Sequence, residues 1–545
     1  MTPIPSLLTQ EMIDRYTAAG YWGRMTLADH LDHHAAYAPA RIAASDARHR
    51  VSFAELKRAT ERVALAMLAM GIRPGDRVGM QTPNWVEFFY VRFACARIGA
   101  IPVPLAYTAR EHEIETALAD TGAKAFFFCA RFGGFDYAAM AAGLRARLPF
   151  VAHWVSIAGR LEGAACLEDM LADPIETRHA PGYLLSFRPS ANDIDILMST
   201  SGSTGKPKFV LRTPNVFLTL GHHIVERARL RPDDVVLGVA PVIQGTGYSV
   251  ATVASLIAGC RNVLLERFDP DAALELIERE RVTVAVGVPT HMIKMMNSAR
   301  LGEFDLGSLR LFYHAGAPLA AEAAAEFARR FGCRLMEAYG ALDGGTPVHT
   351  LYDDPPERVF GTVGKACPGM ELTIADDDGV ALAAGEVGEV VYRGPNCAVG
   401  LWGDANHSFG ADGWFRSGDL GVLDAEGYLR IVGRKKNIII RGGQNISPTE
   451  VEDALVGHPQ IREIAVVKMP DPVFGERVCA FVVPAAGHAL GVADCFAYLV
   501  ERGFAKYKIP ERVENVAELP LLHNGKVDRK RLEALILERV TQEGS

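Results

Sequence analysis

The most informative stretch of this chain is Met198-Ser-Thr-Ser-Gly-Ser-Thr-Gly-Lys-Pro-Lys-Phe-Val210, which is rich in Ser, Thr, Gly and Lys. The mainly apolar run Ile194–Met198 predicts a strand that leads into it. Small residues let backbone amides approach an anion, hydroxyl groups donate to oxygens, and lysines supply positive charge. The composition therefore favours a polyphosphate site, although a solvated Gly/Ser loop can look similar. The candidate phosphate-binding residues are Ser199, Thr200, Ser201, Gly202, Ser203, Thr204, Gly205, Lys206 and Lys208.

Two better-known motifs do not fit this loop. A Walker A loop needs four residues between its first glycine and Gly-Lys, but only two separate Gly202 from Gly205. Ser203 and Lys206 match the Ser-x-x-Lys pattern of penicillin-binding proteins and β-lactamases. That group also needs Ser-Asp-Asn and Lys-Thr-Gly, and neither tripeptide occurs in the sequence. The choice between a phosphate site and a solvated loop depends on the rest of the chain.

Composition excludes several classes of partner. The chain has 545 residues and a formal net charge of −8 at pH 7, which argues against nucleic acid or an anionic membrane as the main partner. Nine cysteines occur without a Cys-x-x-Cys pair, which fits a reducing compartment better than a disulfide framework or zinc site. We see no secretory signal at the N-terminus, and the uncharged run Val235–Cys260 is interrupted by Pro241 and glycines. We expect a cytoplasmic protein.

Strand and helix signals alternate along most of the chain. Ser52 and Glu55 have capping-box spacing, which predicts a helix that runs to Met70 and ends at Gly71. Strands are predicted at Arg77–Met80, Val235–Val239, Val263–Leu265, Val282–Val286 and Leu309–Tyr313, and helices at Asn84–Ile98, Tyr248–Ala258, Pro270–Glu280 and Ala320–Phe331. This alternation predicts parallel sheets in an α/β fold, with ligands bound beyond the carboxyl ends of strands. Ser199–Lys208 would lie at such an end.

The pattern changes after Tyr339. Short strands between Gly and Asp turns, at Gly388–Tyr392, Gly421–Leu423 and Tyr428–Val432, predict a small antiparallel β-subdomain. A basic cluster then interrupts the apolar pattern, and helices are predicted near Pro448–Val456 and Val492–Glu501. We place a domain boundary there, so that residues 1–433 form a large α/β domain and residues 434–545 form a small α+β domain.

Seven separated segments resemble one family when they are taken in order. They are Ser199–Lys208, His314–Leu319, Tyr339–Asp343, Trp414–Leu420, Gly433–Asn437, Gly442–Pro448 and Asn524–Asp528. The set is similar to the acyl- and aryl-adenylate-forming ligases, which include acyl-CoA synthetases, peptide-synthetase adenylation domains and luciferases. The resemblance covers nearly the whole chain. It implies a large N-terminal AMP-binding domain of stacked α/β subdomains, hinged to a small mobile C-terminal domain.

The resemblance also assigns roles around the nucleotide. Ser199–Lys208 would wrap the β- and γ-phosphates of ATP. Asp419 and Arg434 would bind the ribose, because a carboxylate accepts from hydroxyl groups and a guanidinium donates to them. The remaining segments would sandwich the adenine between small residues and an aromatic ring, with candidate residues Gly316, Ala317, Pro318, Tyr339 and Gly340.

One carboxylate would help to hold Mg²⁺ against the phosphates. Asp343 stands where the family usually has Glu, which keeps the hard oxygen but shortens the side chain by one methylene. Leu342 stands where many members carry a Thr that contacts phosphate. The metal geometry of this chain therefore departs from the family pattern, and a nucleotide-binding homologue without ligase activity stays open as an alternative.

Lys526 is the residue expected to catalyse the first step. An ammonium that bridges a carboxylate and the α-phosphate would align two anions and offset their charge. In the resemblance, Lys436 is the hinge about which the C-terminal domain rotates after adenylation. The rotation presents Gly442 and Gly443 to a thiol, and glycines suit a narrow pantetheine channel because side chains would block it.

The loop Pro241–Tyr248 separates this chain from the relatives that it otherwise resembles most, the stand-alone dihydroxybenzoate- and salicylate-type adenylating enzymes. Those enzymes typically have His-Asn in this loop, with the Asn addressing a ring hydroxyl. Here Gln244 and Gly245 stand in their place. We therefore expect an aromatic or cyclic acid other than salicylate or 2,3-dihydroxybenzoate, near Gln244, Gly245, Tyr248, Gly287 and His314.

The thiol acceptor is left open by the sequence. CoA is favoured, because it is the common acceptor among stand-alone members, and phosphopantetheine on a separate carrier protein is the alternative. An oxidase that uses its adenylate as luciferase does is a second rival. The resemblance also allows a homodimer.

Overall fold

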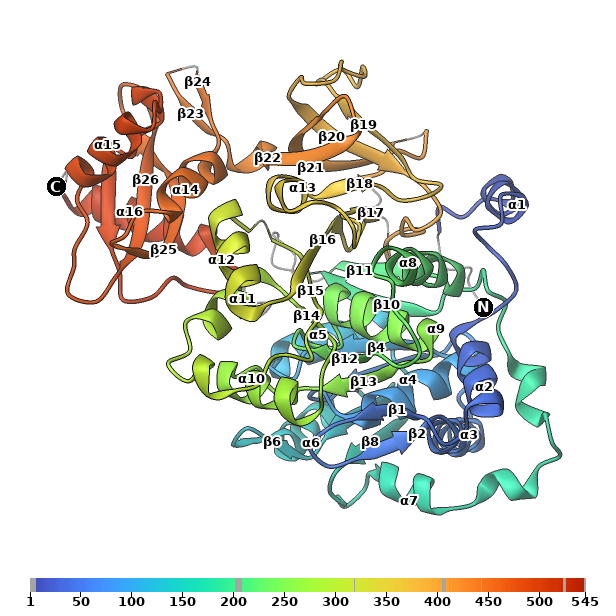
Figure 1. Ribbon diagram of the computed structural model, residues 1–545. Helices are drawn as coiled ribbons and strands as arrows, with labels where there is room; N and C mark the ends of the chain where they lie inside the picture. Colours follow the sequence, from blue (N-terminus) through green and yellow to red (C-terminus); the bar gives the residue numbers. More distant parts are fainter. Residues whose placement is uncertain are drawn as a thin grey trace.

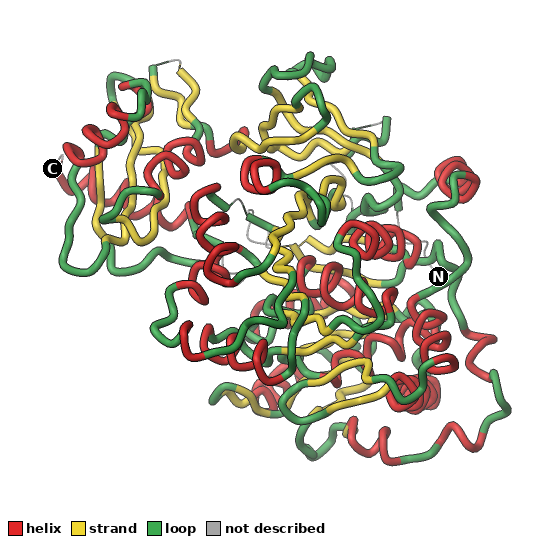
Figure 2. Tube along the Cα trace, viewed as in Figure 1, coloured by secondary structure: helices red, strands yellow, loops and turns green. Residues whose placement is uncertain are grey.

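The computed structural model describes residues 6–200, 208–317, 319–403, 408–410, 412–442, 444–522 and 526–543. A large α/β part is followed by a smaller α+β part that lies beside it, coloured orange to red in Figure 1. Figure 2 shows the strands of both parts flanked by helices. This arrangement confirms the predicted fold class.

The largest sheet in the described residues has thirteen strands. Its centre, from β1 through β13, β12, β14 and β15 to β16, is parallel, as the strand–helix alternation predicts. The segment after Tyr339 does not form a separate sheet, because β17 pairs antiparallel with β16 and continues the same sheet to β19. In spatial order the strands are β19 (Glu371–Ala375), β20 (Gly388–Arg393), β21 (Phe415–Leu423), β22 (Tyr428–Arg434), β18 (Gly364–Ala366), β17 (Gly345–His349), β16 (Arg334–Ala341), β15 (Leu311–Ala315), β14 (Val284–Gly287), β12 (Val235–Gly238), β13 (Arg261–Leu264), β1 (Ile42–Ser45) and β2 (Arg50–Ser52).

A second parallel sheet lies in the first third of the chain. Its strands are β4 (Ile101–Leu105), β3 (Arg77–Gln81), β5 (Ala125–Cys129), β8 (His153–Ile157) and β9 (Ala165–Cys166), and the short strands β6 (Arg131–Phe132) and β7 (Phe135–Asp136) form a hairpin. The helices of the large part are α1 (Gln10–Ala18), α2 (Leu27–Tyr37), α3 (Phe53–Ala69), α4 (Val86–Ile98), α5 (Glu111–Thr121), α6 (Tyr137–Arg147), α7 (Leu167–Ala172), α8 (Pro214–Arg227), α9 (Ala254–Ala258), α10 (Pro270–Arg279), α11 (Pro289–Met296), α12 (Ala321–Phe331) and α13 (Pro356–Gly361). The Ser52–Glu55 capping box opens α3 as predicted.

The phosphate-loop segment does not follow a strand of a parallel sheet. β10 (Ile196–Thr200) and β11 (Lys208–Arg212) pair antiparallel with each other, and residues 201–207 lie outside the described residues. The expectation of a parallel strand end was wrong because an apolar run does not reveal its pairing partner. The hairpin is anchored on its other side, where the Leu211 amide donates to the Gly400 carbonyl at 2.9 Å.

The helix predicted at Tyr248–Ala258 is divided. A π-helix, η3 (Thr246–Val253), precedes α9. Its start is crowded, because a Cβ on Gly247 would lie 2.2 Å from the Pro241 carbonyl oxygen. Within the described residues, no helix is long and apolar enough to cross a membrane.

The smaller part has its own sheet. β24 (Gln444–Ile446), β23 (Ile439–Arg441), β26 (Gly475–Pro484) and β25 (Ile461–Asp471) are adjacent in that order, and β27 (Arg512–Asn515) pairs with β26. The helices α14 (Pro448–Val456) and α15 (Val492–Glu501) have the predicted bounds, and α16 (Arg529–Glu543) follows. β22 ends at Arg434 in the large sheet, and the short turn η5 (Lys435–Asn437) separates it from β23.

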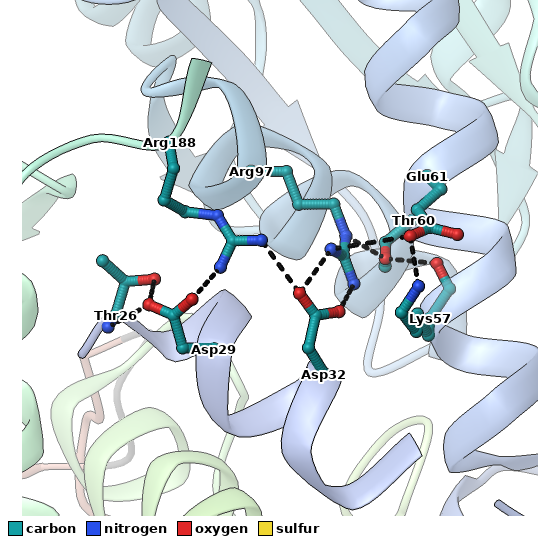
Figure 3. Close-up of polar contacts among 8 residues, drawn as sticks. All are labelled: Thr26, Asp29, Asp32, Lys57, Thr60, Glu61, Arg97 and Arg188. Atoms are coloured by element: carbon teal, nitrogen blue, oxygen red, sulfur yellow. Dashed lines mark hydrogen bonds and ion pairs between the residues drawn. The ribbon is translucent and has the colours of Figure 1, made fainter. Parts of the chain in front are cut away.

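A largely buried ion-pair network joins α2, α4 and Arg188 in the large part. Figure 3 shows Asp32 of α2 between the guanidinium groups of Arg97 and Arg188. Arg97 Nη2 of α4 lies 2.7 Å from Asp32 Oδ1, and Arg188 Nη2 lies 2.9 Å from Asp32 Oδ2. The Arg97 side chain is only 1% exposed, so Asp32 supplies the charge that makes its burial tolerable.

Candidate active site

Three of the predicted nucleotide residues form one hydrogen-bonded cluster. Asp419 on β21 and Arg434 on β22 are cross-strand partners, and Arg434 Nε bonds Asp419 Oδ1. The Tyr339 hydroxyl, at the end of β16, donates to Asp419 Oδ2 at 2.8 Å. Desolvation, together with the charge of Asp419, raises the pKa of Tyr339 well above its ordinary value. The tyrosine therefore stays a hydrogen-bond donor, and the carboxylate is fixed between two donors.

Lys526 reaches the same region from the smaller part. Gly316 has a φ of +89°, and a Cβ built there would lie 3.7 Å from Thr246 Oγ1, 3.8 Å from Val288 Cγ1 and 3.9 Å from Lys526 Cε. Four segments distant in sequence thus meet at this glycine, whose positive φ favours a residue without a side chain, whereas the three neighbouring atoms lie at ordinary van der Waals distance.

Charges link Lys526 to the Asp419 cluster. Desolvation lowers the pKa of Lys526, the positive charge of Arg434 lowers it further, and the negative charge of Asp419 raises it. An ammonium near a cluster that already contains two hydrogen-bond donors is suited to meet an anion.

Asp343 lies in a turn behind this cluster. Burial lowers the pKa of Arg212, and the negative charge of Asp343 acts against that shift; the same charge favours the charged form of Arg434, so the carboxylate is within electrostatic reach of both guanidinium groups. The preceding carbonyl, of Leu342, accepts a hydrogen bond from Arg212 Nη2 at 2.6 Å. Mg²⁺ usually binds through one or two carboxylates together with phosphate oxygens, so a single Asp fits the demand of that cation.

The loop before η3 contributes partly exposed residues beside this turn. Gln244, Gly245 and Thr246 all retain some solvent contact, whereas Gly247 is buried. A Cβ on Gly245 would meet only Leu342 Cδ1, at 3.6 Å, which is an ordinary van der Waals contact. The space beside the Gly245 Cα is therefore largely open, and a larger residue at this position would fill part of it.

Family models match most of this chain. A model described as "AMP-binding enzyme" matches residues 31–402, and "AMP-binding enzyme C-terminal domain" matches residues 450–526. The chain belongs to the AMP-binding enzyme family. This confirms the resemblance to adenylate-forming ligases, and the two matches bracket the position at which β22 ends.

Relatives of this AMP-binding enzyme extend over nearly its whole length. It is 34% identical to the medium-chain fatty-acid–CoA ligase of Escherichia coli over 97% of this chain and 93% of the relative. It is 35% identical to the 2,3-dihydroxybenzoate-AMP ligase of Bacillus subtilis over 99% and 98%. The crystal structure of ATP-bound MatB from Rhodopseudomonas palustris is 30% identical, with a TM-score of 0.83 over 94% of this chain and 99% of that one.

Tyr248 does not line the loop's free space in this AMP-binding enzyme. Its side chain is 0% exposed, and its hydroxyl accepts a hydrogen bond from Arg92 Nε at 2.7 Å. Its ring packs edge-on against Phe88 and Phe217. η3 turns the ring into the core, an orientation that the loop sequence alone does not reveal, and contact of Tyr248 with the acid stays a prediction that this packing does not favour.

His314 lies on the opposite face of the sheet from η3. The neighbouring Tyr313 and Ala315 pack with Val250 and Ala251 of η3, and side chains alternate across a strand. His314 is 1% exposed, and burial lowers its pKa to about 4, so it is neutral at pH 7. The expectation that His314 lies near the acid stays a prediction that this strand geometry does not favour.

Gly287 is enclosed rather than open. A Cβ there would lie 3.1 Å from Phe312 Cζ and 3.3 Å from His291 Nδ1. The glycine ends β14 and allows two neighbouring rings to pack closely, so its predicted role in acid binding stays a prediction that this packing does not favour.

The other predicted site residues are distributed as follows. Ser199 and Thr200 end β10, Lys208 begins β11, and Ala317 follows Gly316. Gly340 is required by its hairpin, because a Cβ there would lie 2.2 Å from the Gly345 carbonyl oxygen. Ser201, Gly202, Ser203, Thr204, Gly205, Lys206, Pro318 and Gly443 lie outside the described residues.

The predicted hinge and channel residues lie around η5 and β23. Lys436 lies within η5, and desolvation together with the charges of Arg434 and Lys530 lowers its pKa. Gly442 has a φ of +56°, and a Cβ there would lie 3.2 Å from Phe474 Cδ1.

Several residues near the site were not assigned a site role from the sequence. Thr246 adjoins Gly316, and its position between two glycines of the acid loop is a signal that could have found it. Arg212 contacts the Asp343 turn, but no spacing rule predicts that contact. Glu337 pairs in register with His314, and desolvation raises its pKa to about 8. A carboxyl group protonated near neutral pH can donate as well as accept, which no sequence pattern indicates.

Proposed function

We propose that this AMP-binding enzyme activates a carboxylic acid with ATP to an acyl-adenylate, releases pyrophosphate, and transfers the acyl group to the thiol of CoA. The observation that carries the proposal is the position of Lys526. Its Cε lies 3.9 Å from the Cβ position of Gly316, within electrostatic reach of Asp419 and Arg434. An ammonium at that place can act where carboxylate and nucleotide meet.

In the first step a carboxylate oxygen of the acid attacks the α-phosphorus of ATP. A new P–O bond forms, the bond to the β-phosphate oxygen breaks, and pyrophosphate leaves. Asp419 and Arg434 would hold the ribose, and Tyr339 would present its ring to the adenine. Lys526 would bridge the acid and the α-phosphate, aligning two anions and offsetting the charge that develops.

Asp343 would hold Mg²⁺ against the phosphates. When bound, Mg²⁺ supplies positive charge to the phosphate oxygens. Arg434 and Lys436 have positive charges near Asp343, which suits a segment that receives a polyphosphate.

The acceptor in the second step is proposed to be CoA. A thiolate attacks the acyl carbon, a thioester forms, and AMP leaves. The relatives include both a CoA ligase and an AMP ligase, so a carrier-bound phosphopantetheine is the competing acceptor. Domain rotation about Lys436, between residues 1–433 and residues 434–545, would bring the Gly442–Gly443 turn to the thiol.

The acid is proposed to be aromatic or cyclic, without the ortho-hydroxyl of salicylate. Support comes from Gly245, which faces room beside Leu342, and from Gln244, which is partly exposed. An Asn at position 245 would take up that room and add a hydroxyl-binding amide, so its replacement by Gly changes both shape and polarity.

Acid-dependent ATP–pyrophosphate exchange tests the first step. Aryl, alicyclic and fatty acids are each supplied with ATP and Mg²⁺, and Lys526→Ala serves as the catalytic control. Exchange that requires one acid class and is lost in the variant is the expected result. If no acid supports exchange, a nucleotide-binding homologue without ligase activity would be favoured. Fastest turnover with salicylate would contradict the substrate proposal.

Thioester detection then tests the acceptor. Mass spectrometry with CoA should show the acyl-CoA of the preferred acid. Adenylate formation without acyl-CoA would favour a carrier protein, and acid-dependent oxygen consumption would favour a luciferase-like oxidase.

A further inference from the structure

Arg212 is a buried arginine without a carboxylate partner among the described residues. Its side chain belongs to a residue only 2% exposed, at the end of β11. Two comparably buried arginines, Arg92 and Arg97, each form an ion pair, with Asp195 and Asp32 respectively. For Arg212, within the part of the chain that the structure describes, no acidic oxygen lies within 4.0 Å.

The donors of Arg212 are also incompletely used. Nη2 donates to the Leu342 carbonyl at 2.6 Å, whereas Nε and Nη1 are buried without a hydrogen-bond partner among the described residues. Desolvation lowers the pKa of Arg212 to about 10, so the group still carries its charge at pH 7. A buried charge with unused donors is costly, so its presence here calls for an explanation.

The hydrogen bond from Arg212 fixes the peptide carbonyl directly before Asp343. The same two segments are also joined indirectly, because the Ala398 amide donates to the Gly344 carbonyl at 3.2 Å and the Leu211 amide donates to the Gly400 carbonyl at 2.9 Å. The Asp343 turn and β11 are therefore held together on two sides, and within the described residues Arg212 is the only side chain that hydrogen-bonds directly from β11 to this turn.

We propose that Arg212 is a positioning residue for Asp343, and that it sets the magnesium dependence of nucleotide binding. The inference rests on the proposed function, because it assumes that Asp343 is the magnesium carboxylate. Asp343 is one methylene shorter than the Glu usual at this place, so its oxygens must be positioned by the backbone of its turn. Arg212 supplies that constraint through the Leu342 carbonyl, and its charge lies within electrostatic reach of the Asp343 carboxylate.

The roles of charge and geometry can be separated by two substitutions. Arg212→Lys keeps a positive charge but loses the planar fork of donors, and Arg212→Met keeps approximate length without charge. Arg97→Lys is the matched control, because Arg97 is 1% exposed and belongs to the network of Figure 3, away from Asp343. It should report the general effect of altering a buried arginine.

The measurement is isothermal titration calorimetry with α,β-methylene-ATP, which cannot release pyrophosphate, with Mg²⁺ and again with EDTA. We expect Mg²⁺ to strengthen binding by the wild-type protein. In Arg212→Met, the factor by which Mg²⁺ strengthens binding should be about tenfold smaller than in the wild type, and in Arg212→Lys the reduction should be smaller. Arg97→Lys should keep the wild-type factor even if its Tm falls. Affinity in EDTA should change less than twofold in all three.

Two results would overturn the inference. One is a folded Arg212→Met protein in which Mg²⁺ strengthens binding by the same factor as in the wild type. The other is an equal loss in Arg97→Lys, which would make the effect one of general destabilisation. If Arg212→Met does not fold, Arg212→Lys decides by the same criterion. A failure of acid-dependent exchange would refute the ligase proposal, and this binding assay would still give its own answer about Arg212.

Discussion

Gly316 lies where segments of both parts of the chain come together. Its φ of +89° favours glycine, and a Cβ built there would have atoms of Thr246, Val288 and Lys526 within 4 Å. Lys526 comes from the smaller part of the chain, whereas the other three residues come from the larger part. The two parts are therefore joined at the point where the acid would meet the nucleotide.

Replacing Lys526 should separate catalysis from stability. In Lys526→Ala, acid-dependent ATP–pyrophosphate exchange should fall by about 100-fold or more, because the ammonium that offsets transition-state charge is gone. The Tm should stay within about 2 °C, since the substitution creates no core cavity. Lys530→Ala, at the start of α16, is the matched control and should retain exchange. Near wild-type exchange in Lys526→Ala would contradict the assignment.

Two glycines of the acid loop should respond differently to the same methyl group. Gly245→Ala adds a Cβ 3.6 Å from Leu342 Cδ1, so the protein should fold normally while KM for the preferred acid rises several-fold. Gly247→Ala places a Cβ 2.2 Å from the Pro241 carbonyl oxygen, so it should lower the Tm strongly. Thermal denaturation and exchange kinetics measure both effects. Identical behaviour of the two variants would show that Gly245 does not face the acid.

At the scale of elements, local signals and long-range packing differ in how well sequence reveals them. α14 has its predicted bounds because Ser447 caps it through the Glu450 amide, an interaction within four residues. The pairing of β10 with β11 was missed because nothing in an apolar run names its partner strand. The burial of the Tyr248 ring was likewise not foreseen, since its place on η3 decides which way the side chain points.

The ion-pair network around α2 gives a pH-dependent prediction. Arg97 and Arg188 lower the pKa of Asp32 against the opposing effect of its burial. A carboxylate with a lowered pKa stabilises the fold above its unfolded pKa, and that stabilisation is lost as pH falls through the folded pKa. Asp32→Asn should therefore reduce the free energy of unfolding by about 3 kcal/mol at pH 7, because it removes the nearer carboxylate of the buried Arg97 and leaves only Glu61, whose Oε1 lies 3.9 Å from Arg97 Nη1.

Urea denaturation at several pH values measures this effect. The difference between wild type and Asp32→Asn should shrink as the pH is lowered into the acid range, where Asp32 becomes protonated. Asp169→Asn is the control, since Asp169 pairs with Arg160 on the surface, with side chains 49% and 76% exposed. It should cost less than about 1 kcal/mol. A pH-independent difference for Asp32→Asn would refute the electrostatic explanation.

For the molecule as a whole, the sequence motifs predicted which residues would share one site, but they did not reveal how two sheets present those residues. β21 and β22 continue the large sheet, and this continuity brings Asp419 and Arg434 beside Tyr339. β22 then ends at Arg434, before η5 and a separate sheet. A proposed rotation at Lys436 would thus leave the nucleotide cluster with the large part while it moves Lys526 away.

Gly442 tests whether the two proposed steps use different faces of the smaller part. Gly442→Ala puts a side chain at φ +56°, 3.2 Å from Phe474 Cδ1, in the turn that the second step would present to the thiol. Exchange should remain within about threefold of wild type, because Lys526 is untouched, whereas acyl-CoA formation should fall by about tenfold or more. Gly487→Ala is the matched control, with a φ of +81° and nothing within 4 Å, and it carries similar backbone strain. It should impair neither step. A parallel loss of both activities in Gly442→Ala would mean that one face serves both reactions, and the rotation would then have no role to explain.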